Sequence, residues 1–274
     1  METGMAIGLG LLRGLTEFLP ISWEGHLAFL RMISGMAAPS SVVELCLHLG
    51  LLAALLLCYG KRLVSMFAHP LQSELKWLIL SVGPAVAAAY TVRDQISGLY
   101  QSRYLGPIFL ISSLILMIGQ GVGTFYKEPR GHVRFYDALV MGALRAVSIL
   151  PGMSPNGSAM AGGLATGLKR KRAADFAFCM AVPVVIWDIV RDVQAVSAQA
   201  AAQETGLWVL FRDQITSAGY APLISAGCAM IAGAAAIRLM VGLVKRGNLK
   251  WFSVYTLLLG LSIIAWQLIQ GGEL

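Results

Sequence analysis

Five residues with chemically active side chains lie in one short segment near the start of this chain. They are Arg13, Glu17, Ser22, Glu24 and His26. Arg13 and Glu17 are four residues apart, so they share one face of a helix. The other three follow a proline, where a helix is interrupted, and lie near the expected start of the next helix. An arginine binds anions, a serine can act as a nucleophile, and a histidine can act as an acid or base.

Each of these features also has a purely structural explanation. Arg13 and Glu17 fit a buried ion pair that only fixes the chain, and Ser22 fits a helix N-cap. Ionisable groups are rare inside apolar membrane segments and usually functional there. The grouping of the five side chains therefore favours a site, with Glu17, Ser22, Glu24 and His26 as catalytic candidates.

A second polar segment, at 151–158, interrupts the apolar pattern again. Its Ser154, Asn156 and Gly157 are residue types that present N–H groups to a phosphate, although an ordinary Gly/Pro turn has the same composition. Arg145 precedes Ser154 by nine residues, as Arg13 precedes Ser22. We therefore expect Arg145, Ser154, Asn156 and Gly157 to bind phosphate together with Arg13.

The two segments are related by a constant spacing. Arg13 and Arg145, Ser22 and Ser154, and Gly25 and Gly157 each pair at an offset of 132 residues. Each segment is also polar, broken by proline and enclosed by apolar runs. This pattern indicates a duplicated unit.

The composition is that of a multi-span membrane protein. Of 274 residues, 57% are hydrophobic and 13% are charged, and the mean hydropathy is +0.71. Soluble domains carry about 25% charged residues. The net charge of +7 does not indicate nucleic-acid binding, because the basic residues lie in short loops between apolar runs.

Apolar runs of two lengths alternate along the chain. Short runs flank each break, at 5–19 and 26–36 and again at 135–150 and 158–168. None of these reaches the roughly 30 Å thickness of a hydrocarbon core, so each pair predicts a re-entrant hairpin. Runs long enough to span the membrane follow at 41–60, 75–92, 105–123, 173–191, 218–243 and 251–269.

The predicted fold is an all-α integral membrane protein with an inverted-topology repeat. Each unit has one re-entrant helical hairpin and three transmembrane helices. The whole chain, 1–274, forms a single membrane domain, with repeat one at 1–125 and repeat two at 132–270. Tracing this topology gathers most Lys and Arg on one side, which we expect to be cytoplasmic in a bacterial inner membrane.

Several other residues carry weaker signals. Cys46, Cys58, Cys179 and Cys228 stand singly in apolar segments and predict neither disulfides nor a metal site. Glu44 and His48 are four apart, but two ligands do not make a metal site. Asp137, Asp175 and Asp188 lie near the ends of spans and are expected to be solvated.

The chain resembles the BacA-type undecaprenyl-diphosphate phosphatases, bacterial membrane enzymes that recycle the cell-wall lipid carrier. The resemblance is carried by GLTEFLPIS at 14–22 with Gly25 and His26, and by Glu44 with His48, Leu49 and Gly50. It continues through Lys61 and Arg62, Asp137, Gly142, Pro151 and Gly152 with Ser154 and Gly157, and ends at Ala173, Ala174, Phe176, Phe178, Ala181 and Pro183. The family fold has six spans and two re-entrant hairpins, which agrees with the pattern above.

This sequence departs from the family motifs where the chemistry occurs. The first of two family acids is replaced by Arg13, and the segment SSTGH becomes SWEGH at 22–26. In the second motif Pro155 replaces a phosphate-binding arginine, Asn156 replaces a serine, and Arg145 replaces a glutamine. Glu17, Ser22, His26 and Ser154 match the family.

These changes leave two hypotheses. In the first, Arg13 and Arg145 replace the missing arginine, Glu24 replaces the missing acid, and the protein remains a lipid-diphosphate phosphatase. In the second, hydrolysis is lost and the protein binds or translocates a polyprenyl phosphate. The expected partners are a polyprenyl phosphate or diphosphate lipid and the bilayer, with no nucleic acid. A divalent cation, Mg²⁺ or Ca²⁺ with Glu17 as a ligand, and a homodimer are both left open.

Overall fold

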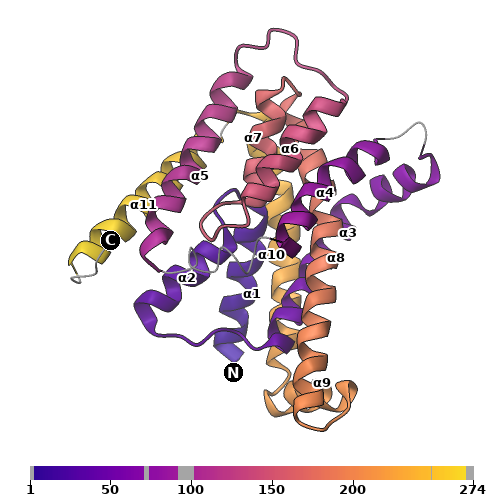
Figure 1. The fold of residues 1–274 in the computed structure, drawn as a ribbon, viewed down its shortest axis with the longest axis vertical. Helices are drawn as coiled ribbons and strands as arrows, with labels where there is room; N and C mark the ends of the chain where they lie inside the picture. Colours follow the sequence, from indigo (N-terminus) through magenta and orange to yellow (C-terminus); the bar gives the residue numbers. More distant parts are fainter. Residues whose placement is uncertain (1–2, 71–73, 92–101, 248, 270–274) are drawn as a thin grey trace.

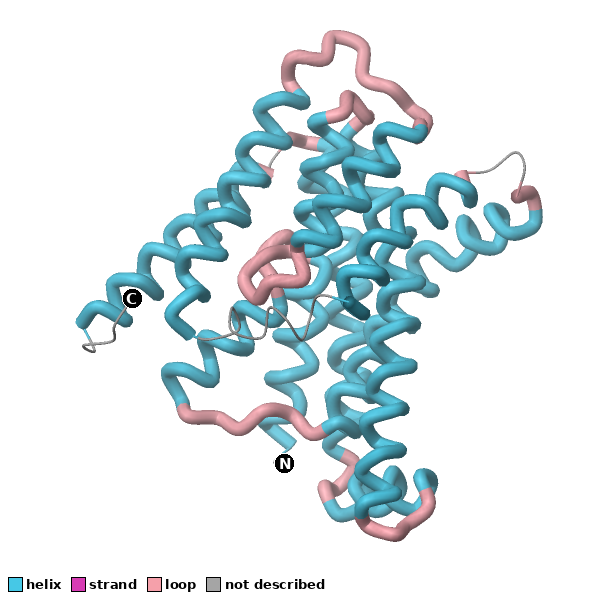
Figure 2. The backbone as a smooth tube through the Cα atoms, in the orientation of Figure 1, coloured by secondary structure: helices cyan, strands magenta, loops and turns pink. Residues whose placement is uncertain are grey.

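The computed structural model describes residues 3–70, 74–91, 102–247 and 249–269. Within them the chain is helical, with one isolated bridge between Arg130 and Leu168 and no strand, so the all-α class is confirmed (Figure 2). The helices are α1 (Thr3–Phe18), α2 (Trp23–Ser34), α3 (Ser41–Ala68), α4 (Leu75–Thr91), α5 (Ser102–Gly123), α6 (Phe135–Val147), α7 (Pro155–Ala165), α8 (Arg170–Ala202), α9 (Leu207–Ser217), α10 (Ala221–Lys245) and α11 (Lys250–Ile269).

The two predicted breaks separate short helices that begin in the same way. α2 begins after Ser22, whose side chain accepts the Gly25 N–H at 3.2 Å. α7 begins after Ser154, whose side chain accepts the Gly157 N–H at 3.1 Å. Each serine satisfies a backbone donor that the first turn of a helix leaves without a partner. The N-cap interpretation of Ser22 is therefore correct, and the other contacts of Ser22 decide whether it also belongs to a site.

Long helices from both halves of the chain surround the short ones. α1 packs along α10, and α6 packs along α4. α3 lies against both α8 and α10, while α5 lies beside α11 and also packs on α7 (Figure 1). The short helices α1, α6 and α7 therefore pack against helices from distant parts of the sequence, whereas only Trp23 and Gly25 of α2 are buried.

Glycines allow the closest of these approaches. A Cβ on Gly10 of α1 would overlap the backbone of Ser225 on α10. A Cβ on Gly142 of α6 would overlap the backbone of Ser81 on α4 in the same way. Small residues at such contacts let helix backbones approach closely, which is how helices pack within membranes.

Five described helices are long and apolar enough to cross a membrane, namely α3, α5, α8, α10 and α11. The apolar part of α4 is shorter and covers Leu75–Ala87. The multi-span prediction is therefore confirmed in its coarse form. The predicted runs 41–60 and 173–191 are too short, since α3 and α8 continue through polar residues at their ends. The sequence pattern did not predict α9.

Two aspartates that were expected to be solvated are buried. Asp137 receives two hydrogen bonds of 2.8 Å from the guanidinium of Arg130. Asp175 lies 3.2 Å from Arg62 and accepts a 3.0 Å hydrogen bond from the hydroxyl of Tyr59. The prediction of solvation is wrong for both, because neighbouring polar side chains compensate the burial of each carboxylate.

Candidate active site

The break between α1 and α2 contacts the break between α6 and α7. The backbone N–H of Gly152 donates a 3.1 Å hydrogen bond to Ser22 Oγ. The hydroxyl of Ser154 donates in return to the carbonyl of Leu19, at 3.4 Å. The two polar segments of the sequence thus meet through their capping serines.

Glycines permit this contact on both sides. A Cβ on Gly25 would lie 2.8 Å from the Cα of Gly152. A Cβ on Gly157 would lie 2.6 Å from the Cβ of Pro20. Neither distance is tolerated between real atoms, so a larger residue at either position would push the two breaks apart.

Ser22 combines a strained backbone with an unusual hydrogen-bond pattern. Its φ of 69° lies in the left-handed region, which costs a non-glycine residue about 1–3 kcal/mol. Its Oγ accepts N–H hydrogen bonds from both Gly25 and Gly152. Two such donors stabilise negative charge on the oxygen or on a group bound next to it.

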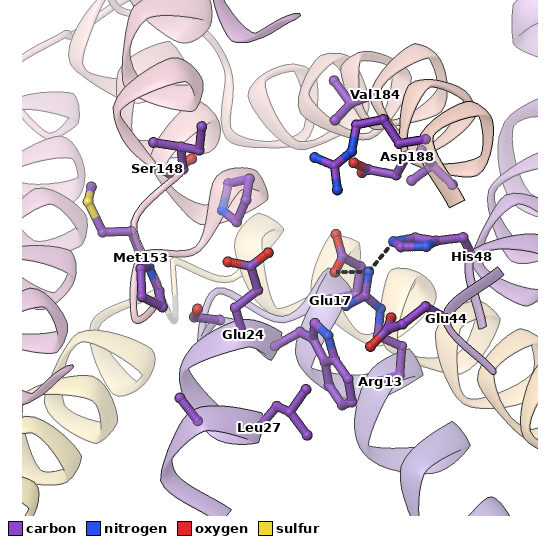
Figure 3. Close-up of a pocket in the computed structure, with 18 of the residues that line it drawn as sticks. Arg13, Glu17, Glu24, Leu27, Glu44, His48, Ser148, Met153, Val184 and Asp188 are labelled. Carbon is purple, nitrogen blue, oxygen red and sulfur yellow. Dashed lines mark hydrogen bonds and ion pairs between the residues drawn. The ribbon is translucent and has the colours of Figure 1, made fainter. Parts of the chain in front are cut away.

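A cavity of about 470 Å³ opens beside the first break. Figure 3 shows the carboxylates of Glu17, Glu24, Glu44 and Asp188 around it, with His48 at its edge. The charged residues of its lining are five acids, Glu17, Glu24, Glu44, Asp188 and Asp192, and four arginines, Arg13, Arg31, Arg145 and Arg191. So many charges around one space in an apolar protein indicate a polar ligand.

Arg13 lies in the wall of this cavity and is held on three sides. Its Nη2 is 2.6 Å from Nε2 of His48 and 3.7 Å from a carboxylate oxygen of Glu17. Its guanidinium stacks on Trp23, with 4.8 Å between its central carbon and the ring centroid. The Nε of Arg13 is buried and has no hydrogen-bond partner. A guanidinium in a cavity wall whose hydrogen-bonding capacity is not fully used is suited to an anion.

Arg145 shows the same property from the second half of the chain. Its Nη1 donates to Oδ1 of Asn156 at 3.0 Å, while its buried Nε has no partner. The side-chain amide of Asn156 donates at 2.8 Å to the backbone carbonyl of Glu17. Asn156 therefore links Arg145 to α1 and orients its guanidinium.

The predicted site residues divide into two groups. Those that line the cavity are Arg13, Glu17, Ser22, Glu24 and Arg145. The part of the chain that the structure describes places His26, Ser154, Asn156 and Gly157 outside this lining. Ser154 and Gly157 form the cap of α7, so they build the break behind the cavity wall.

His26 is not among the residues that line the cavity, and both of its ring nitrogens are hydrogen-bonded. Nδ1 lies 2.7 Å from the backbone carbonyl of Ser22, and Nε2 lies 2.7 Å from the hydroxyl of Tyr255 on α11. The rings of His26 and Tyr255 are stacked. In this arrangement His26 fixes the backbone of Ser22, and proton transfer through Nε2 requires that nitrogen to leave Tyr255.

Sequence reasoning missed part of the cavity wall. His48 and Asp192 are buried there and joined by a 2.6 Å hydrogen bond between Nδ1 and Oδ2. Glu44 and Asp188 each lie one helical turn before them and also line the cavity. The available signal was two polar pairs at a spacing of four, one in α3 and one in α8. Each pair alone was too weak to indicate a site.

The donor set gives little support to a resident metal ion. Among the described residues, no group of three or more His, Cys, Asp or Glu side chains is placed to hold one. Glu17, the predicted ligand, contacts the guanidinium of Arg13 instead. The four cysteines are free.

Comparison with known proteins agrees with the sequence pattern. A family model described as bacitracin resistance protein BacA matches residues 6–262. The undecaprenyl-diphosphatase of Carboxydothermus hydrogenoformans is 29% identical over 269 residues, which cover 97% of this chain and 98% of the relative. That of Syntrophotalea carbinolica is 31% identical over 273 residues, covering 93% and 95%. That of Christiangramia forsetii is 28% identical over 284 residues, covering 98% and 100%.

Proposed function

Because the chain belongs to the BacA family, we propose that it is a membrane phosphatase that converts a polyprenyl diphosphate, of the undecaprenyl class, to the monophosphate. The observation that carries the proposal is one cavity lined by a strained serine and two arginines with unsatisfied Nε atoms. A diphosphate supplies several acceptor oxygens to such donors. The monophosphate product would be a cell-wall lipid carrier that can be used again, as the family resemblance implies.

Arg13 and Arg145 bind the diphosphate in this proposal. They line the same cavity and come from the two halves of the chain. Each has a buried Nε with no hydrogen-bond partner, and its guanidinium is a planar fork that matches phosphate geometry. Together they replace the arginine that the family motif has at Pro155 and neutralise the charge that develops on the transferred phosphoryl group.

Ser22 is the proposed nucleophile. Its Oγ attacks the terminal phosphorus, the bond between that phosphorus and the bridging oxygen breaks, and the prenyl monophosphate leaves. Glu17, alone or with Glu24, takes the hydroxyl proton. Water then attacks the phosphoserine, releasing phosphate and restoring the serine proton. Two N–H donors on Oγ favour its reaction as an oxyanion.

His26 is proposed as the second proton-handling group, acting next to the backbone of Ser22 that it contacts. The steps above use only side chains of this protein and water. The involvement of a divalent cation, Mg²⁺ or Ca²⁺, stays a prediction. It is tested by measuring the rate of phosphate release with and without the cation.

We further propose that the chain consists of two inverted repeats, at 1–125 and 132–270. The packing of α1 on α10 and of α6 on α4 supports this, because each hairpin then contacts a span of the other repeat. The matching serine caps and glycine contacts support it as well. In such folds the site lies near the membrane midplane, where the repeats meet.

The proposed orientation places the basic loops in the cytoplasm of a bacterial inner membrane. It is tested by single cysteines introduced at exposed positions 171 and 213, on opposite sides of the predicted topology. An impermeant thiol reagent added to intact cells, with the outer membrane permeabilised where one is present, should label Asp213→Cys and spare Lys171→Cys. The reverse pattern would overturn the orientation.

The deciding experiment for function is phosphate release from a long-chain prenyl diphosphate by the purified protein, with and without a divalent cation. Release of one phosphate per lipid supports the phosphatase. If no prenyl chain length gives turnover while the prenyl monophosphate binds, the alternative holds, and the protein is a binder or translocator of the phosphorylated lipid.

A further inference from the structure

Three buried side chains from three helices are linked by hydrogen bonds in the wall of the cavity. Asp192 of α8 accepts from Nδ1 of His48 on α3, and Nε2 of His48 accepts from Nη2 of Arg13 on α1. Both distances are 2.6 Å, and all three residues are buried. Asp192 thus fixes the tautomer of the imidazole with its proton on Nδ1, which leaves Nε2 free to accept from Arg13.

We propose that His48 and Asp192 are positioning residues for phosphate binding, acting through Arg13. This inference rests on the function proposed above. It assigns a role to His48, which the family resemblance includes without a role, and to Asp192, which lies in none of the segments that carry the resemblance.

The geometry explains why Arg13 needs such support. Its contact with Glu17, at 3.7 Å, is too long for a strong hydrogen bond. Trp23 stacks on the guanidinium but does not fix its rotation within the plane of the ring. The short bond to His48 supplies that constraint on Nη2 and leaves the Nε donor without a protein partner. A donor held in place before the ligand arrives binds it at a lower entropic cost.

A purely structural role predicts something different. If His48 and Asp192 only compensate the buried charge of Arg13, their loss lowers stability and leaves phosphate affinity unchanged. If they position Arg13, their loss lowers affinity, and that loss disappears when Arg13 is already absent. A double-mutant cycle separates these outcomes.

The experiment measures binding of a prenyl diphosphate analogue whose bridging oxygen is replaced by a methylene group, so it does not depend on turnover. Arg13→Ala, His48→Ala and the double variant are compared in detergent. We expect His48→Ala to weaken binding about tenfold, and the double variant to bind no more weakly than Arg13→Ala. His48→Gln, whose amide oxygen can accept from Arg13, should recover part of the affinity. With the hydrolysable diphosphate, His48→Ala should raise KM more than it lowers kcat.

Tyr59→Phe is the matched control. Tyr59 and Asp175 join the same two helices, α3 and α8, by a 3.0 Å hydrogen bond outside the cavity lining. This variant should lose some thermal stability and keep the affinity of the wild type. Additive losses in the double variant, or unchanged affinity in a folded His48→Ala protein, would overturn the positioning role. Absence of phosphate release by the wild type would overturn only the phosphatase proposal.

Discussion

The N–H of Gly152 donates to the hydroxyl oxygen of Ser22 at 3.1 Å, and this bond joins two chain breaks that lie 130 residues apart. Gly25 packs directly on Gly152 at the same point, and Gly157 packs on Pro20. The strained backbone of Ser22 is therefore supported from the other half of the chain. The integrity of the site should depend on residues that never touch the ligand.

Gly25→Ala tests that dependence. The new methyl group would lie 2.8 Å from the Cα of Gly152, and backbone cannot yield as a flexible side chain does. We expect a destabilisation of about 1–3 kcal/mol, typical of overpacking, and a lower rate of phosphate release. Thermal unfolding in detergent and an activity assay measure the two effects.

Gly8→Ala is the control, since a Cβ on Gly8 meets no atom within 4 Å. Alanine also favours helix over glycine by about 1 kcal/mol. This variant should be as stable as the wild type or more stable, and fully active. Equal thermal stability and equal activity of the two alanine variants would contradict the close contact between the two chain breaks.

Arg13→Ala and Arg145→Ala test the proposed anion site. Each removes a charged donor from the cavity wall, so each should weaken binding of the prenyl diphosphate by about 1.5–3 kcal/mol, roughly 10- to 150-fold. Arg212→Ala serves as the control, because Arg212 is exposed on α9 and paired only with Asp213 in the contacts described. Unchanged affinity in both cavity variants would rule out the proposal that Arg13 and Arg145 bind phosphate in place of the family arginine.

The sequence predicted those features that depend on local chemistry. Pro20 and Pro151 indicated the two breaks, and the constant offset indicated that Ser22 and Ser154 occupy equivalent places. The apolar runs predicted the long helices. Their predicted bounds were wrong where a helix continues through polar residues beyond the apolar run. The short amphipathic helix α9 left no apolar run long enough to detect.

The contacts between distant helices could not be predicted in the same way. His48 and Asp192 are separated by 144 positions, and nothing in either local pattern specifies the other. The same reason explains the misassignment of Asp137 and Asp175. Acidic residues near span ends are usually solvated, and only the tertiary structure places Arg130 and Arg62 against these two.

Glu74→Gln tests the ion-pair network on the side of the basic loops. The Glu74 carboxylate contacts Arg172 at 2.6 Å and Arg62 at 3.3 Å, and accepts from the N–H of Val133 at 2.8 Å. Loss of its charge should destabilise the protein by about 1.5–3 kcal/mol. KM for the lipid diphosphate should not change, since Glu74 does not line the cavity. A shift in KM comparable to that of Arg145→Ala would show that the network reaches the site.

His26 is tested by two substitutions that separate its contacts. His26→Asn keeps a donor near the position of Nδ1 for the Ser22 carbonyl but cannot transfer a proton at neutral pH. If His26 handles protons, both His26→Ala and His26→Asn should lose at least the roughly 100-fold in kcat that is typical of a general acid or base. Tyr255→Phe, which releases Nε2, should keep substantial activity. Near-normal turnover by His26→Asn would show that His26 only fixes the backbone of Ser22 and transfers no proton.

Glu24→Thr restores the residue that the family motif has at this position. Glu24 lines the cavity in the first turn of α2, with its carboxylate facing the same space as that of Glu17 (Figure 3). If Glu24 has taken over the task of the acid that Arg13 replaces, threonine cannot bind the proton, and kcat should fall although the motif becomes more family-like. Glu44→Gln, which also removes a cavity carboxylate, is the comparison and should have a smaller effect on kcat. Steady-state phosphate release measures both, and an unchanged or higher kcat in Glu24→Thr would show that the reaction does not require the Glu24 carboxylate.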